Sequence, residues 1–306
     1  MLAQTFHRFT SGGIGLLPQV ALHTAITAFV IAAIIALVAL FAPGRARMKW
    51  ADITGAAGTA ALLIYFGARF AEAGLAPLQN LFEVITLTAL CLAGAYFVAT
   101  RLKPMPALGG FAFPALAAVF LVSLLAGGTI EVADERSPLS AMVVLHVLLT
   151  ILAYGVFFMA AVAASMFLIQ ERALKRHHTP GFARHFPPLE SLRKLLHQCL
   201  WVGLPLLTVG FALGFGAFPA DQWGALAMTP KVLTALVLWL VLLAGTLGRL
   251  TGWLHGRRHS YLVLLGFGLV LGTYIGLALF VRAENEHAPR GAPRAAVWQE
   301  APCTAL

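Results

Sequence analysis

The sequence predicts an all-α fold: a polytopic membrane helix bundle of about eight transmembrane helices, with both termini outside. Three observations lead to this prediction. The chain of 306 residues is 60% hydrophobic and only 11% charged, and its mean hydropathy is +0.85. Soluble domains usually carry about 25% charged residues. The apolar residues also gather in long runs, and the basic residues between the runs alternate as a membrane topology requires.

A helix needs about 20 apolar residues to cross the hydrocarbon core of a bilayer. The stretches that meet this requirement are 18–42, 51–70, 78–100, 108–127, 139–169, 199–217, 229–250 and 259–281. Two of them contain an internal proline, Pro114 or Pro205, which membrane helices tolerate. No strand pattern and no internal repeat interrupts the series, so we expect a purely helical bundle.

The basic residues test this map through the positive-inside rule. When the 43–50 loop is placed inside and the following loops alternate, the inside segments carry two thirds of the 21 basic residues. These are Arg45, Arg47, Lys49, Arg101, Lys103, Arg172, Lys175, Arg176, Arg184, Arg193, Lys194, Arg249, Arg257 and Arg258. The 128–138 loop on the other side is acidic. The distribution places both termini outside, and the first run is expected to remain as a permanent helix rather than a cleaved signal.

Three segments lie outside the predicted spans. Residues 1–17 are expected to form a short external N-terminus, before a transmembrane domain that covers 18–281. Within it, 170–198 is expected to be an inner-surface loop with a short amphipathic helix that starts after Pro187 and Pro188. Residues 282–306 are rich in Ala, Pro and charge and are expected to be a disordered external tail.

Composition and cysteine spacing exclude several functional classes. The net charge of +9 comes without a stripe of Lys and Arg interleaved with aromatic residues, so no nucleic-acid partner is expected. The cysteines, Cys91, Cys199 and Cys303, are far apart in sequence. Without a C-x-x-C motif, a thiol–disulfide carrier, a covalent haem attachment site and a zinc knot are all disfavoured.

Polar residues gather at the predicted outer ends of the spans: His23, Arg69, Glu72, Asn80, Glu83, His146, Trp223 and Lys231. Ionisable residues inside a membrane span are candidates for function. Imidazole can ligate haem iron, and cations at the membrane edge can bind the carboxylates of haem propionates. A metal-ion site is less supported, because no H-x-x-x-H or E-x-x-H motif occurs, and a transporter would need more intramembrane charge.

Each of these residues also has a structural alternative. Glu83 can pair with Arg69 or Lys231 and lock helices together, and His146 can hydrogen-bond a neighbouring helix. His23 can be a packing residue, and Trp223 can belong to the interfacial aromatic belt. Arg69 and Lys231 can simply extend toward the headgroups unless an anion lies between them.

Four segments resemble the CcsA/ResC-type family of cytochrome c assembly proteins, in the same order along residues 60 to 280. The first runs from Arg69 through Gly74 and Pro77 to Asn80-Leu81-Phe82-Glu83. The others are "LHVLLTILAYGVFFMAA", which contains His146, "TPKVLTALVLWL" with the later "GRLTGW", and "LLGFGLVLGTYIG". The resemblance is closest to the HemX/YpjD-like branch, which lacks an intact tryptophan-rich motif. Here Leu226, Met228 and Thr229 replace the Trp, Trp and Asp of that motif, and Leu75 and Leu247 stand where full synthetases have membrane histidines.

The resemblance implies a bacterial inner-membrane protein of c-type cytochrome biogenesis that binds or traffics haem at the outer face and is not itself an enzyme. The lipid bilayer and other cytochrome c maturation proteins are its expected partners. In this interpretation His146 is an axial ligand of haem iron, with His23 as a possible second, Arg69 and Lys231 contact the propionates, and Trp223 forms a wall. Glu83 organises its helices through Arg69 or Asn80. The alternative is a HemX-like accessory or regulatory protein that acts by protein contact without bound haem.

Overall fold

The computed structural model describes residues 15–42, 45–79, 81–125, 139–176, 186–219, 221, 223–224, 228, 230–252 and 256–287. Within these ranges the chain is helical and contains no strand. The long helices are α2 (Leu16–Phe41), α3 (Arg45–Ala73), α4 (Leu81–Leu102), α5 (Gly109–Leu125), α6 (Ala141–Lys175), α7 (Leu189–Gly216), α9 (Pro230–Leu250) and α10 (Arg257–His287). Two short 3₁₀ helices, Ala76–Gln79 and Pro106–Leu108, precede α4 and α5.

The described helices confirm the predicted fold class. Six of them, α2, α3, α4, α6, α7 and α9, are long and apolar enough to cross a membrane, and α5 is a shorter apolar helix. Each of the eight predicted spans falls on one long helix, and large apolar side chains such as Ile34 and Val38 lie exposed on the bundle surface. A surface of this kind is stable in contact with lipid and unfavourable in water.

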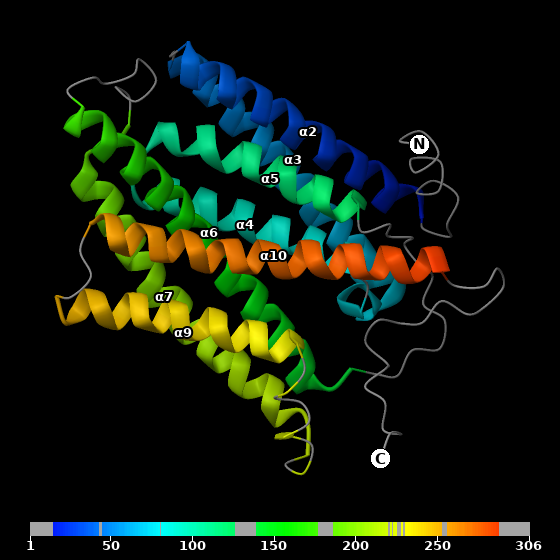
Figure 1. The fold of residues 1–306 in the computed structure, drawn as a ribbon. Helices are drawn as coiled ribbons and strands as arrows, with labels where there is room; N and C mark the ends of the chain where they lie inside the picture. Colours follow the sequence, from blue (N-terminus) through cyan, green and yellow to red (C-terminus); the bar gives the residue numbers. More distant parts are fainter. Residues whose placement is uncertain are drawn as a thin grey trace.

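α6 is the central helix of the bundle. It packs against α4 on one side and against α7 and α10 on the other, while α2, α3 and α5 lie beyond α4 (Figure 1). Glycines allow the closest approaches: a Cβ at Gly155 would lie 2.8 Å from the backbone oxygen of Cys91 on α4. A Cβ at Gly203 of α7 would lie 2.6 Å from the ring of Phe157. Close backbone contact through small residues is the usual way in which membrane helices associate.

The helices alternate in direction along the chain. α2, α4, α6 and α9 begin at the end of the bundle where α3, α5, α7 and α10 finish (Figure 1). We call this end the His146 end, because His146 lies in the second turn of α6 there. We call the opposite end the basic end. All of the positively charged residues predicted to lie inside are described except Arg184, and those described lie at or near this end.

Of the segment 170–198, the structure describes residues 170–176 and 186–198. α6 continues to Lys175 with Arg172 and Lys175 in its last turn, where cations interact favourably with the helix dipole. α7 begins at Leu189, directly after Pro188, and runs without a break to Gly216. The predicted amphipathic segment is therefore the first part of the same helix that forms the sixth span.

Candidate functional site

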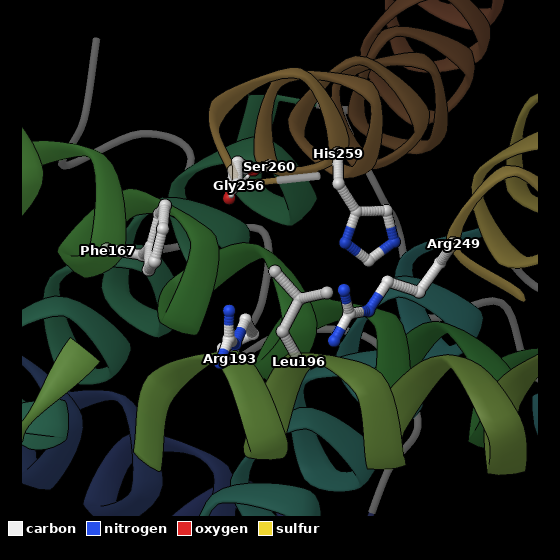
Figure 2. Close-up of a pocket in the computed structure, with 7 residues that line it drawn as sticks. All are labelled: Phe167, Arg193, Leu196, Arg249, Gly256, His259 and Ser260. Atoms are coloured by element: carbon white, nitrogen blue, oxygen red, sulfur yellow. Dashed lines mark hydrogen bonds between the residues drawn. The ribbon is translucent and has the colours of Figure 1, made fainter. Parts of the chain in front are cut away.

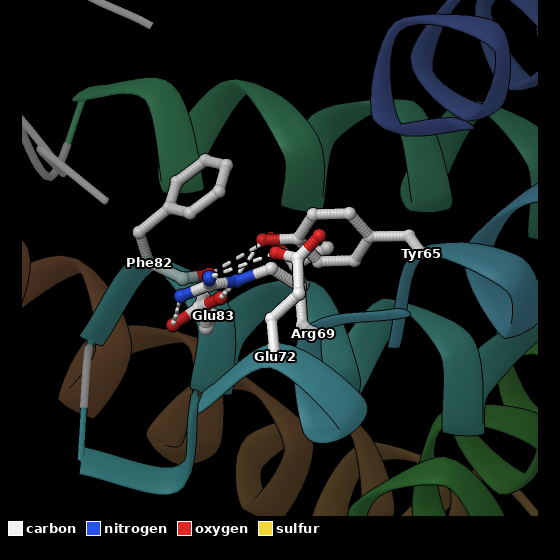
Figure 3. Close-up of polar contacts among 6 residues, drawn as sticks. Tyr65, Arg69, Glu72, Phe82 and Glu83 are labelled. Atoms are coloured by element: carbon white, nitrogen blue, oxygen red, sulfur yellow. Dashed lines mark hydrogen bonds and ion pairs between the residues drawn. The ribbon is translucent and has the colours of Figure 1, made fainter. Parts of the chain in front are cut away.

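A buried ion pair joins α3 to α4 at the His146 end. The Nε atom of Arg69 lies 2.7 Å from Oε1 of Glu83, and its terminal nitrogen donates to Oε2 at 3.5 Å. The hydroxyl of Tyr65 also donates to Oε1 of Glu83, at 3.0 Å (Figure 3). Arg69 is 4% exposed and Glu83 is 1% exposed, so neither charge can be solvated by water instead. The pair therefore satisfies two charges that would be costly if left alone.

A second carboxylate lies at the edge of this ion pair. Glu72 approaches the guanidinium of Arg69 at 3.7 Å, and its side chain is 39% exposed (Figure 3). Just beyond it, Gly74 ends α3 with a positive φ of 56°, and its N–H donates to the carbonyl of Phe70 at 3.0 Å. This left-handed residue is the common way to end a helix and turn the chain. The turn brings α4 back against α3, so that Glu83 reaches Arg69.

His146 lies on a different side of the same end, between α6 and α7. Its Nδ1 atom is 2.6 Å from the carbonyl oxygen of Gly210 on α7, and the side chain is partly buried. The absence of a side chain at Gly214 makes room for this contact: a Cβ there would lie 2.8 Å from Nδ1 and Cε1 of the ring. Thr150, one turn further on α6, donates to the carbonyl of His146 at 2.7 Å.

The hydrogen bond to Gly210 fixes the chemistry of the imidazole. A carbonyl oxygen only accepts, so Nδ1 must carry the proton. In the neutral ring the other nitrogen, Nε2, then holds a lone pair, and no described residue hydrogen-bonds to it. Histidine ligands of metals are commonly held in this way, with one nitrogen bonded to a carbonyl and the other free to coordinate.

The remaining predicted residues are placed separately. The indole N–H of Trp223 lies 3.1 Å from the carbonyl oxygens of Phe215 and Phe218, so Trp223 covers the C-terminal end of α7. His23 bonds the carbonyl of Gln19 in its own helix through Nδ1 at 2.6 Å. Asn80 and the side chain of Lys231 lie outside the described residues.

Those predicted site residues whose side chains are described do not form one cluster. Val144 and Val147 of α6 pack toward the apolar cluster that contains Tyr65 and Phe82, whereas His146 faces α7. Described contacts thus link Arg69 to Glu83 and His146 to α7, but not the two groups to each other. Across the described ranges no three His, Cys, Asp or Glu side chains gather as a metal-ion site.

The two leucines at positions of family histidines lie at opposite ends of the bundle. Leu75 follows α3 at the His146 end and is 44% exposed, whereas Leu247 lies near the end of α9 at the basic end and is 49% exposed. Neither side chain can ligate iron, and described residues do not bring them together. Gly210 and Gly214 are site residues absent from the sequence predictions, and so is Tyr65. Its spacing of four residues from Arg69 on a helix was the available signal.

Comparisons with known proteins show where this chain belongs. The family model described as "Cytochrome C assembly protein" matches residues 78–282, about two thirds of the chain. The relatives include a protein named cytochrome c biogenesis protein CcsA from Guillardia theta, 28% identical over 238 residues that cover 71% of this chain and 78% of that protein. The protein of the same name from Thermosynechococcus vestitus is 26% identical over 283 residues, covering 77% of this chain and 88% of that protein. No solved structure gives a significant match. The chain therefore belongs to the cytochrome c assembly protein family, whose CcsA-type members it matches.

Proposed function

We propose that this membrane protein of c-type cytochrome assembly binds haem as cargo at the His146 end, with Nε2 of His146 as the protein's ligand to iron. The single observation that carries this proposal is the 2.6 Å hydrogen bond from Nδ1 of His146 to the carbonyl of Gly210. It leaves Nε2 as the coordinating atom and holds the ring in one orientation. Family membership supplies the chemical context, because haem is the group attached during c-type cytochrome assembly.

The side chains around His146 fit a porphyrin better than a hydrated ion. Met142 and Leu145 lie on the same part of α6 and are about half exposed, and they provide apolar surface beside the imidazole. Trp223 extends this apolar surface at the end of α7, where its ring meets Phe215 edge to face. Sites for large apolar ligands usually combine such a lining with a few fixed polar groups. The donor set of one imidazole among apolar side chains therefore suits haem iron.

The structure favours different roles for the two proposed propionate contacts. The guanidinium of Arg69 is committed to Glu83, whose carboxylate also accepts from Tyr65, so we assign it to holding α3 and α4 together. Lys231 is the second residue of α9, at the His146 end, and remains the proposed cationic contact. Recruiting Arg69 to a propionate would break a buried ion pair, at a cost of about 3–5 kcal/mol.

We further propose that the His146 end faces the outer side of a bacterial inner membrane. Basic residues concentrate at the opposite end, and the positive-inside rule places such an end in the cytoplasm. Haem bound near His146 would then lie on the side where c-type cytochromes are assembled. Other maturation proteins are the proposed partners at this surface.

Haemin titration of the purified full-length protein tests the proposal. In mild detergent, addition of haemin should produce a saturable Soret shift in the visible spectrum. The shift should be lost in His146→Ala and kept in His197→Ala, which removes an imidazole from the other part of α7. No shift in the unaltered protein, or an equal shift in His146→Ala, would contradict the assignment.

The accessory function remains a second candidate, because Leu75 and Leu247 replace histidines of full synthetases and both are exposed apolar side chains. An accessory protein would show no saturable Soret shift. It would instead co-purify with a maturation protein from membranes of its own organism. Absence of any stable partner in that preparation would count against this function.

A further inference from the structure

A small pocket lies at the basic end, where α6, α7, α9 and α10 come together. Its lining comes from different parts of the sequence: Phe167, Arg193, Leu196, Arg249, Gly256, His259 and Ser260 (Figure 2). Arg193 and Leu196 belong to α7 and Arg249 to the last turn of α9, whereas Gly256 directly precedes α10 and His259 and Ser260 lie in its first turn. This pocket is at the opposite end of the bundle from His146 and plays no part in the proposed haem contact.

His259 carries an unsatisfied polar atom into this pocket. The residue is 3% exposed, and its Nε2 atom has no hydrogen-bond partner within the described part of the chain. Native proteins rarely leave a buried polar atom without a partner, because such an atom has lost its hydrogen bonds to water without replacing them. On α7, His197 shows a similar feature: Trp201 donates to its Nε2 at 2.8 Å, whereas its buried Nδ1 has no described partner. A ligand for His259 is therefore expected in the pocket.

The charges around the pocket decide the sign of that ligand. Arg249 reaches toward His259 (Figure 2), and no carboxylate within the described ranges pairs with it. Arg193 pairs with Glu190, and the nearest other carboxylate, Glu171, is bonded by Lys175 at 2.7 Å and approached by Nε of Arg257 at 3.8 Å. The cations thus outnumber the carboxylates. A metal cation bound by the imidazoles would be repelled, whereas an anion would be attracted.

The start of α10 adds donors for an anion. The first N–H groups of a helix have no partner within the helix, and the positive end of the helix dipole lies there. α10 runs for 31 residues, and its first turn provides two lining residues of the pocket, His259 and Ser260. Gly256, with a positive φ of 54°, lets the chain turn sharply into the helix. The free N–H groups of the helix start and the paired N–H donors of an arginine guanidinium are together well suited to bind the oxygens of a phosphate.

We propose that this pocket binds a phosphate-type oxyanion, held by Arg249, His259 and the first turn of α10, with Arg193 at its rim. The oxyanion can come from the headgroup phosphate of an anionic lipid or from free phosphate. Both carry the same chemistry, and Phe167 and Leu196 form the apolar part of the lining. Binding there would tie the ends of α7, α9 and α10 together on the basic side of the membrane.

The test uses the full-length protein purified in mild detergent and stripped of lipid. One arm adds inorganic phosphate, with chloride at equal ionic strength as its control. The other arm reconstitutes the protein in nanodiscs of phosphatidylcholine, with or without phosphatidylglycerol. The apparent Tm is measured in both arms, and native mass spectrometry counts the phosphatidylglycerol molecules retained. We expect a rise in Tm on addition of the anion, and Arg249→Gln should raise the anion concentration required for this effect at least tenfold.

Arg258→Gln is the matched control, because Arg258 is an exposed neighbour of the pocket on the first turn of α10 and carries the same charge. It should retain the effect. Stabilisation by phosphatidylglycerol alone identifies the lipid headgroup as the source, and stabilisation by inorganic phosphate identifies a free anion. Arg249→Lys keeps the positive charge but loses the paired N–H donors of the guanidinium. This variant should remain folded and bind the anion more weakly than the unaltered protein. No stabilisation in either arm, or equal losses in Arg249→Gln and Arg258→Gln, would overturn the proposal.

Discussion

Gly214 of α7 leaves just enough room for the imidazole of His146. A Cβ at position 214 would lie 2.8 Å from both Nδ1 and Cε1 of the ring, closer than real Cβ contacts. Two helices that approach so closely fix the ring in one position, and Gly210 supplies the carbonyl that orients it. The haem proposal depends on this relationship between α6 and α7, because a ligand to iron must be held in place as well as present.

Gly214→Ala should therefore displace the His146 ring. Overpacking at such a contact costs about 1–3 kcal/mol, so the affinity for haemin should fall by roughly tenfold. Gly216→Ala is the matched control, because a Cβ there would lie 3.9 Å from Met142, an ordinary contact. Haemin titrations followed at the Soret band compare the two variants. Equal affinities would show that the ring position does not govern binding.

Glu83→Gln should destabilise the bundle strongly. It leaves the guanidinium of Arg69 buried without its carboxylate, and removal of one partner from a buried ion pair costs about 3–5 kcal/mol. Thermal unfolding in detergent, followed by circular dichroism, provides the measurement. The control is Glu72→Gln, whose carboxylate is partly exposed and 3.7 Å from Arg69, so it should lose only about 0–1 kcal/mol. Similar losses in the two variants would contradict the structural role of Glu83.

Gly155→Ala should weaken the packing of α6 on α4. The added Cβ would meet the backbone oxygen of Cys91 at 2.8 Å, and a backbone atom cannot move aside as a side chain can. We expect a lower apparent Tm, corresponding to about 1–3 kcal/mol. Gly94→Ala on α4 should be neutral or slightly stabilising, since nothing lies within 4 Å of its added Cβ and alanine is the better helix former. A Tm unchanged by Gly155→Ala would place the close approach of these helices in doubt.

The proposed orientation predicts which positions are accessible from outside. In a background with Cys303→Ser, Asp221→Cys should react with a membrane-impermeant maleimide on intact cells. Arg258→Cys at the basic end should react only after the cells are broken. Both side chains are exposed on the bundle, so a lack of reaction reports membrane sidedness rather than burial. The reverse pattern would invert the proposed topology.

The sequence was sufficient to predict the fold because the thickness of the bilayer determines the length of each apolar run. Each predicted span corresponds to one observed helix, and most of their ends differ by a few residues. The largest difference is at α7, which begins at Leu189 instead of 199. No glycine or proline lies between Leu189 and Val202, so the amphipathic turns and the span form one continuous helix.

The site was less predictable because depth in the membrane does not determine the direction in which a side chain points. Sequence analysis placed Glu83 and His146 at the same end, yet helix rotation turns one toward Arg69 and the other toward α7. The partner of His146, Gly210, is 64 residues away and contributes a backbone carbonyl, for which no sequence pattern exists. The pairing of Arg69 with Glu83 could be predicted from the sequence, because few opposite charges occur at that depth in the membrane.

Imidazole rescue tests the central claim most directly. In His146→Gly the iron ligand is removed and space is left in its place, so haemin should give no specific Soret shift. Added imidazole should then occupy that space, coordinate the iron and restore a shift close to that of the unaltered protein. His23→Gly, treated identically, shows whether a second histidine contributes. Retention of the full Soret shift by His146→Gly without imidazole would contradict the account.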